Sequence, residues 1–232
     1  MNNERASAVK VFRKFVGTLG WIAVVVQLVA TLTLPTGPGA LTRTVNYFSF
    51  FTILSNILVA ATITVPYLMG RSRAGRIFLR YELRTALAVY MIITCGIYAT
   101  LLAGLSPLTE VQYLADVMLH YVIPPLYLID WMLIWPEFRI DWKNVFYFLI
   151  FPLLYGVYTL VRGAMTGLYP YPFVDVTKLG YPAVLITFGL FVLLFLGVSV
   201  IMVAVGRWRA PWPEIKRPER RRSHILPPQP SP

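Results

Sequence analysis

The chain has 232 residues, of which 57% are hydrophobic and 13% are charged, and its formal net charge is +11. Soluble domains usually carry about 25% charged residues, so this composition excludes an ordinary water-soluble globule. The single cysteine, Cys95, excludes an intramolecular disulfide as a source of stability. The composition therefore indicates a protein that lies largely within lipid.

Five stretches of the sequence lack Asp, Glu, Lys and Arg and are long enough for a membrane-spanning helix, which takes roughly 20 apolar residues. These stretches cover residues 15–42, 44–70, 85–109, 144–161 and 179–206. A sixth stretch, at about 112–135, is as apolar but contains Asp116, His120 and Asp130. Helices suit such runs because their backbone polar groups are satisfied within the segment, and the runs lack the alternation of a β-barrel.

We therefore expect an all-α, polytopic membrane protein with six transmembrane helices. The expected helices cover about 15–34, 48–69, 85–106, 112–135, 143–163 and 181–205. With this topology, 18 basic residues fall on one side of the membrane and only Arg43, Arg162 and Lys178 on the other. Because cytoplasmic loops are rich in Lys and Arg, this division places both termini and the loops at 70–84 and 136–142 in the cytoplasm, as in a protein of the cell membrane.

The sequence divides into a membrane domain, residues 1–206, and a tail, residues 207–232, that is rich in proline and basic residues. Such a composition cannot bury a core, so the tail is predicted to be disordered, cytoplasmic and attracted to anionic lipid headgroups. The positive charge lies beside apolar spans and therefore indicates membrane lipids, not nucleic acid, as partners. Residues 35–46 and 164–180 are the two long external loops of this topology.

The fourth expected helix carries its ionisable groups on one narrow face. At 100° per residue, His120, Tyr127 and Asp130 lie within about 40° of Asp116. This face is expected to line the bundle interior or a wet cavity, because ionisable groups that face lipid are costly. Asp116 and His120 are four residues apart and can pair directly. Two consecutive prolines follow, and the helix is expected to kink at the level of the histidine.

Thr52, Ser55 and Asn56 share one face of the second expected helix. This helix and the fourth both run from outside to inside. At 1.5 Å per residue, Thr52 lies about 6 Å and His120 about 10 Å below the outer ends of their spans. The hydroxyl and the imidazole are therefore expected at a similar depth. A hydroxyl beside a histidine that is backed by a carboxylate is the arrangement that activates an alcohol nucleophile.

Three sequence segments strengthen this interpretation: FFTILSNIL at 50–58, HYVIPPLYLIDW at 120–131 and TGLYPYPFVD at 166–175. In combination they resemble the androgen-induced membrane proteins, a family of six-span threonine hydrolases with bacterial relatives. The resemblance implies the six-helix fold, with Thr52 as the catalytic threonine and His120 as the catalytic histidine. It also implies hydrolysis of esters between fatty acids and hydroxy fatty acids.

The hydrolase hypothesis assigns a role to each candidate residue. His120 takes the proton of Thr52 as the threonine attacks an ester carbonyl, and Asp116 orients the imidazole. The residues expected on the substrate-binding side of the site are Asn56, Arg162, Asp175 and Asp130.

The substrate-side residues differ in what they are expected to bind. Asn56 is the best side-chain amide donor to the oxyanion, with Asn46 or a backbone N–H as alternatives. Arg162 either holds a lipid carboxylate or snorkels to the membrane interface. Asp175 is expected to cap or order the external loop over the site. The sequence shows no metal-ligand cluster, phosphate-binding loop or dinucleotide motif, so no metal or cofactor is expected.

Two other classes of protein fit the same residues. In a proton-coupled permease, Asp116, His120 and Asp130 form a relay along the fourth helix. In a structural membrane protein, the same groups hold helices together through hydrogen bonds. Thr52 discriminates among the three interpretations, because a relay or a clasp hardly needs its hydroxyl, whereas the hydrolase fails without it.

Overall fold

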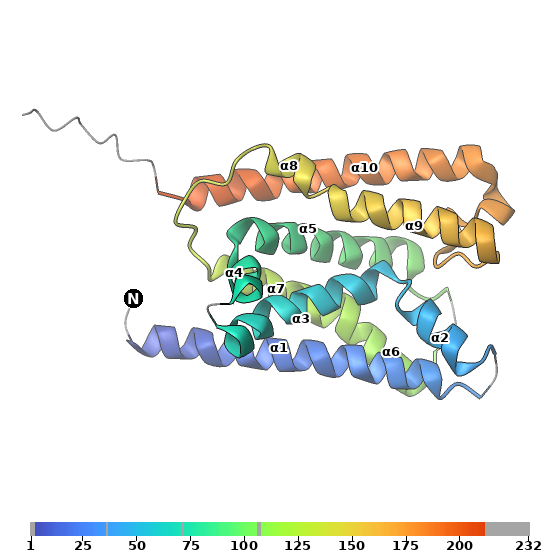
Figure 1. The fold of residues 1–232 in the computed structure, drawn as a ribbon, viewed down its shortest axis with the longest axis horizontal. Coiled ribbons are helices and arrows are strands. Elements are labelled where there is room, and N and C mark those ends of the chain that lie inside the picture. The colour runs from blue at the N-terminus through green and yellow to red at the C-terminus, as the bar shows by residue number, and fades with distance from the viewer. Residues whose placement is uncertain (1–2, 36, 71, 106–107, 212–232) are drawn as a thin grey trace, which may run out of the picture.

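The computed structural model describes residues 3–35, 37–70, 72–105 and 108–211, and the regular elements within these residues are all helical (Figure 1). In chain order the α-helices are α1 (Asn3–Leu32), α2 (Ala40–Tyr47), α3 (Phe51–Met69), α4 (Arg73–Leu79), α5 (Tyr81–Ile97), α6 (Glu110–Val117), α7 (Ile123–Met132), α8 (Asn144–Tyr147), α9 (Ile150–Thr166) and α10 (Val176–Arg209). The remaining elements are two π-helical segments and one 3-10 turn: η1 (Tyr98–Leu102), η2 (Met118–Val122) and η3 (Pro172–Val174).

Five helical segments are long and apolar enough to cross a membrane. They are Ser7–Leu32, Phe51–Met69, Tyr81–Leu102, Asn144–Thr166 and Val176–Arg209. These segments confirm the all-α class and fit a protein with several membrane crossings. The fourth predicted helix, at about 112–135, forms as the continuous run α6–η2–α7. Contrary to the expectation that it is as apolar as the others, its ionisable residues and two prolines make it less apolar than the five segments named above.

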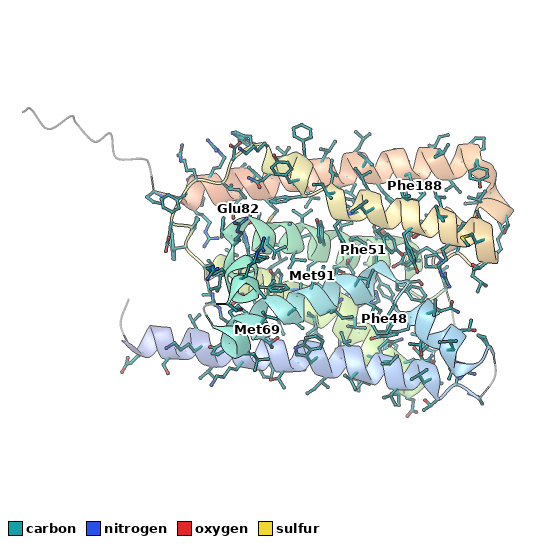
Figure 2. The ribbon with its side chains drawn as sticks, in the orientation of Figure 1. Phe48, Phe51, Met69, Glu82, Met91 and Phe188 are labelled. Carbon is teal, nitrogen blue, oxygen red and sulfur yellow. The ribbon has the colours of Figure 1, made fainter. Side chains whose placement is uncertain are left out.

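Helix α5 lies at the centre of the bundle, with α3 and α7 on one side and α10 on the other (Figure 1). Residues 86–91 of α5 are buried, and Met91, which Figure 2 labels, has no exposed surface. Helix α1 packs along α3 and α6, and α9 and α10 form the opposite edge of the bundle (Figure 1). We call the end of the bundle that holds α2 and the α9–α10 loop the α2 end, and the opposite end the α4 end.

Short helices replace parts of two predicted loops. The predicted external loop at 35–46 contains most of α2, and the predicted cytoplasmic loop at 70–84 contains α4. Arg43 explains the first difference, because its guanidinium donates to carbonyl groups at the C-terminal end of α1 and holds α2 against it. Ser72 caps α4 by accepting a hydrogen bond from the Gly75 amide at 3.0 Å.

The other predicted loop and the tail also have different bounds. The α9–α10 loop is shorter than the predicted 164–180, because both helices extend into it. An interruption in α10 remains at Gly180, whose φ of 76° is a left-handed conformation that favours glycine. Helix α10 continues to Arg209, so the first residues of the predicted tail are helical, and 212–232 lie outside the described residues.

Asp130 of α7 is fully buried and joins two arginines near the α4 end. Its Oδ1 accepts a hydrogen bond from Arg13 Nε of α1 at 2.6 Å, and its Oδ2 accepts one from Arg84 Nη1 of α5 at 3.1 Å. Arg84 also donates to the carbonyl of Thr62 in α3 at 2.7 Å. Asp130 thus clasps helices together, about 15 Å along the helix from His120, and the prediction that it binds substrate is replaced by this structural role.

We predict that Asp130→Asn destabilises the fold by about 3–5 kcal/mol, because it leaves the buried Arg84 without its counter-ion. Asp141→Asn is the matched control, since Asp141 and Lys143 pair at 3.2 Å but both side chains are more than half exposed. Thermal unfolding in detergent should show a large loss of stability for the first variant and little change for the second. Equal stability of the two variants would contradict the clasp.

Candidate functional site

The candidate site forms where the first turn of α3 meets η2. Thr52 is the second residue of α3, and His120 lies in the middle of η2. Thr52 Oγ1 lies 3.2 Å from His120 Nε2, and the two residues are only 7% and 8% exposed. The structure therefore brings together the two side chains that the sequence places at a similar depth.

The contacts of the other ring nitrogen assign the tautomer of His120. Its Nδ1 lies 2.9 Å from the carbonyl oxygen of Asp116 and 3.1 Å from Asp116 Oδ1. A carbonyl and a carboxylate only accept hydrogen bonds, so Nδ1 carries the ring proton. In the neutral ring Nε2 is then an acceptor, and the Thr52 hydroxyl donates to it. Asp116 and His120 thus pair at the spacing that the sequence predicts.

Tyr98 of η1 holds both members of this pair. Its hydroxyl donates to Asp116 Oδ2, and its ring stacks on the His120 imidazole with centroids 3.7 Å apart and an interplanar angle of 18°. Each oxygen of the carboxylate therefore has a donor. A tyrosine near the end of a membrane helix is an ordinary interfacial residue, so only tertiary packing reveals this role.

The local sequence explains the π-helical geometry around the histidine. Pro124 and Pro125, in the first turn of α7, lack amide hydrogens, so the carbonyls of His120 and Tyr121 lose their α-helical donors. The backbone widens into the π segment directly before these prolines. Wider turns of this kind occur frequently at functional sites. The kink expected at His120 thus takes the form of η2, which places the imidazole against α3.

Asn56, the expected oxyanion donor, has a different role in the structure. Its Nδ2 donates to the carbonyls of Thr52 at 2.8 Å and Leu119 at 3.3 Å, and the residue has no exposed surface. Both amide protons are therefore used, one within α3 and one to join α3 to η2. No donor is left on this side chain for an oxyanion, so we replace the predicted binding role by a positioning one.

A donor for an oxyanion, the hydroxyl of Tyr171, lies instead at the start of α3. The first amides of a helix have no acceptor within it, and Phe50, at the N-cap, provides no side-chain cap. The hydroxyl of Tyr171 accepts a hydrogen bond from the Phe51 amide at 3.1 Å and lies within hydrogen-bonding reach of Thr52. Because this hydroxyl has a proton of its own, it can donate to a group bound beside Thr52.

Arg162 and Asp175 order the α9–α10 loop. Arg162 donates to the carbonyl of Leu168 at 3.0 Å and to Asn46 Oδ1, and so ties the loop to α2. In these contacts the guanidinium of Arg162 binds groups of the protein itself, in place of a lipid carboxylate. Asp175 is the N-cap of α10, and its hydrogen bonds from Thr177 hold the pKa of the carboxyl below its ordinary value. This position agrees with the loop-ordering role expected for Asp175.

Two cavities meet at Thr52. The polar cavity, of about 690 Å³, is lined in part by Asp116 and His120. The apolar cavity, of about 240 Å³, lies between α5, α9 and α10. Val157 and Leu185 line the apolar cavity and are also 61% and 57% exposed, so this wall reaches the outside of the bundle between α9 and α10. The candidate nucleophile therefore stands at a boundary between a polar and an apolar space.

No family model, curated protein or solved structure matches this chain. Within the described residues, no group of three or more His, Cys, Asp and Glu side chains is placed to hold a metal ion. What the site can do chemically follows from its own geometry. A hydroxyl donates to a histidine that is backed by a carboxylate, which is a set of groups able to activate an alcohol as a nucleophile.

Gly163 of α9 packs closely against the loop that carries Tyr171. A Cβ atom at Gly163 would lie 1.9 Å from the ring of Tyr169, which is in the same loop as Tyr171. We predict that Gly163→Ala displaces this loop and speeds amide hydrogen exchange over residues 168–174. Gly189→Ala is the matched control, because its Cβ would meet nothing within 4 Å. If both variants exchange at the wild-type rate, the loop does not depend on this contact.

Proposed function

We propose that this protein is an integral membrane hydrolase of lipid carboxylic esters, with Thr52 as nucleophile and His120 as general base. The observation that carries the proposal is the series in which the threonine hydroxyl donates to the imidazole and the imidazole donates to Asp116. The resemblance of three sequence segments to the six-span threonine hydrolases supports it, and we propose membership of that family. The proposed substrates are esters of fatty acids with hydroxy fatty acids, or similar lipid esters.

In the proposed reaction, Thr52 Oγ1 attacks the ester carbonyl carbon while His120 Nε2 takes the hydroxyl proton. Asp116 stabilises the imidazolium that forms and keeps its orientation, and Tyr98 holds Asp116. The tetrahedral intermediate then breaks its bond to the alcohol oxygen, which receives the proton from His120, and an acyl-threonine remains. Water attacks this acyl group with His120 again as base, which releases the carboxylic acid and restores Thr52.

The oxyanion of the intermediate is proposed to bind the hydroxyl of Tyr171, which the Phe51 amide holds at the start of α3. This donor lies beside Thr52, and the positive end of the α3 dipole adds to its effect. A fixed donor of this kind typically contributes about 10²–10³-fold to the rate. The apolar cavity is proposed to accept the acyl chain of the substrate, and the polar cavity to accept the alcohol half.

We also propose six membrane crossings with both termini in the cytoplasm. The run α6–η2–α7, the fourth in chain order, is proposed as a crossing in addition to the five apolar segments. The resulting even number fits the position of the start of α1 and the end of α10 at the α4 end (Figure 1). The basic residues favour this end as the cytoplasmic one. Asp116 and His120 are then acceptable within the membrane because they face the polar cavity instead of lipid.

Loss of either catalytic partner should remove the same activity. We expect Thr52→Ala, His120→Ala and the double variant to lose nearly all hydrolysis of a fluorogenic lipid ester, each to about the same residual rate. The reason is that residues that act as a unit do not contribute additively. Thr52→Ser keeps a hydroxyl and should retain measurable activity. A fluorophosphonate should label the wild-type protein and fail to label Thr52→Ala.

Thr187→Ala is the matched control for these variants. Thr187 lies in α10, donates to the carbonyl of Ala183 and belongs to neither cavity lining. Thermal stability in detergent must be followed in parallel, because truncation of a buried polar group also destabilises a bundle. A well-folded Thr52→Ala protein that hydrolyses lipid esters at the wild-type rate would overturn the assignment, and the permease would become the hypothesis to test.

Cysteine accessibility tests the topology in a Cys95→Ala background. We expect a membrane-impermeant thiol reagent to label Pro38→Cys and Lys178→Cys in intact cells, and Arg73→Cys only after permeabilisation. All three positions are exposed, the first two at the α2 end and the third at the α4 end. External labelling of Arg73→Cys would reverse the orientation. Labelling of positions 38 and 178 from opposite sides would exclude six crossings.

A further inference from the structure

The apolar cavity has the size and position of a binding site for an acyl chain. It begins at Thr52, and its lining includes Phe51 and Phe188, both labelled in Figure 2. One water takes about 30 Å³ of liquid volume, so a cavity of about 240 Å³ holds about eight groups of that size. This capacity corresponds to a medium-length chain.

The lining of this cavity includes five hydroxyl groups, and three of them, on Thr52, Tyr155 and Tyr171, form hydrogen bonds with other residues. Thr94 of α5 and Thr159 of α9 are only 6% and 1% exposed, and among the described residues neither Oγ1 has a hydrogen-bond partner at normal length. Thr159 interacts only loosely with the hydroxyl of Tyr155, whose own proton goes to the carbonyl of Ser49 at 2.8 Å. A buried polar group without a partner costs stability and calls for an explanation.

Other threonines of this chain show the usual way in which a helix satisfies the hydroxyl. Thr85, Thr100 and Thr187 each donate to the carbonyl four residues earlier, at 2.8, 2.7 and 3.1 Å. Thr94 and Thr159 depart from this pattern although both lie within regular α-helices. Because the two hydroxyls come from different helices and share one cavity, they indicate a polar atom of a ligand between those helices.

We propose that the apolar cavity binds the acyl half of an ester whose chain carries a hydroxyl group, and that Thr94 and Thr159 recognise this hydroxyl. The inference rests on the proposed ester hydrolysis at Thr52, where the cavity begins. A hydroxyl on the chain provides one donor and two acceptor sites, which is enough to pair with both threonine hydroxyls. A plain acyl chain leaves them unpaired, and a site of this kind discriminates against a substrate that lacks the hydroxyl.

The test compares the umbelliferyl ester of decanoic acid with esters of hydroxydecanoic acids that carry the hydroxyl near the carboxyl end, in the middle or at the far end. The purified full chain should hydrolyse at least one hydroxydecanoate with a kcat/KM about tenfold above that of decanoate. Thr94→Val and Thr159→Val should each reduce this ratio. The double variant should bring it close to one and still hydrolyse decanoate.

Two control variants separate the hydroxyl from the fold. Thr94→Ser keeps the hydroxyl and should keep the preference, and so should Thr187→Val, which lies outside both cavity linings. Thr52-dependent hydrolysis of decanoate without preference for any hydroxydecanoate would overturn the inference but leave the proposed function intact. A preference that persists in the double variant would overturn the role of the two threonines. Absence of Thr52-dependent hydrolysis of any of these esters would overturn the proposed function, and the inference with it.

Discussion

Lipid supplies neither hydrogen bonds nor counter-ions, so a charged group between membrane helices needs a partner within the protein. Asp130 meets this requirement with Arg13 and Arg84, and the resulting cluster fixes α1, α5 and α7 near the α4 end. Towards the α2 end, Asp116 meets the same requirement with His120 and with a tyrosine of η1. One physical constraint thus produces both the clasp that holds the helices and the ordered imidazole of the candidate site.

The position of Thr52 shows how a helix start can support chemistry. As the second residue of α3, it lies where the backbone amides have no acceptor within the helix and where the helix dipole is positive. An oxyanion that develops beside it would meet the positive end of this dipole and the hydroxyl of Tyr171, which the Phe51 amide holds in place. Asn56 is therefore not needed as a donor, and its amide joins α3 to η2 instead.

The sequence predicts the relations that are local or that follow from depth in the membrane. Asp116 and His120 are four residues apart in the sequence, and they pair in the structure. Thr52 and His120 are expected at similar depths, and their side chains are in contact. Arg84 shows a contact that the sequence does not predict. From the sequence alone its charge serves only to assign topology, whereas in the structure its guanidinium pairs with Asp130. Which basic residue meets a buried acid depends on how the helices pack. Helices α2 and α4 are likewise too short for periodicity to separate them from loops.

The separation of the polar groups along α6–η2–α7 bears on the choice between a relay and a hydrolase. A relay along this helix requires Asp130 to exchange protons with groups near His120, about 15 Å away at 1.5 Å per residue. Both carboxylate oxygens of Asp130 are occupied by guanidiniums, which suits a fixed ion pair better than a proton carrier. Ester hydrolysis requires only the groups around His120. In the proposed hydrolase, the Asp130 cluster would serve as the rigid support that a site needs if its groups are to be held at reacting distance.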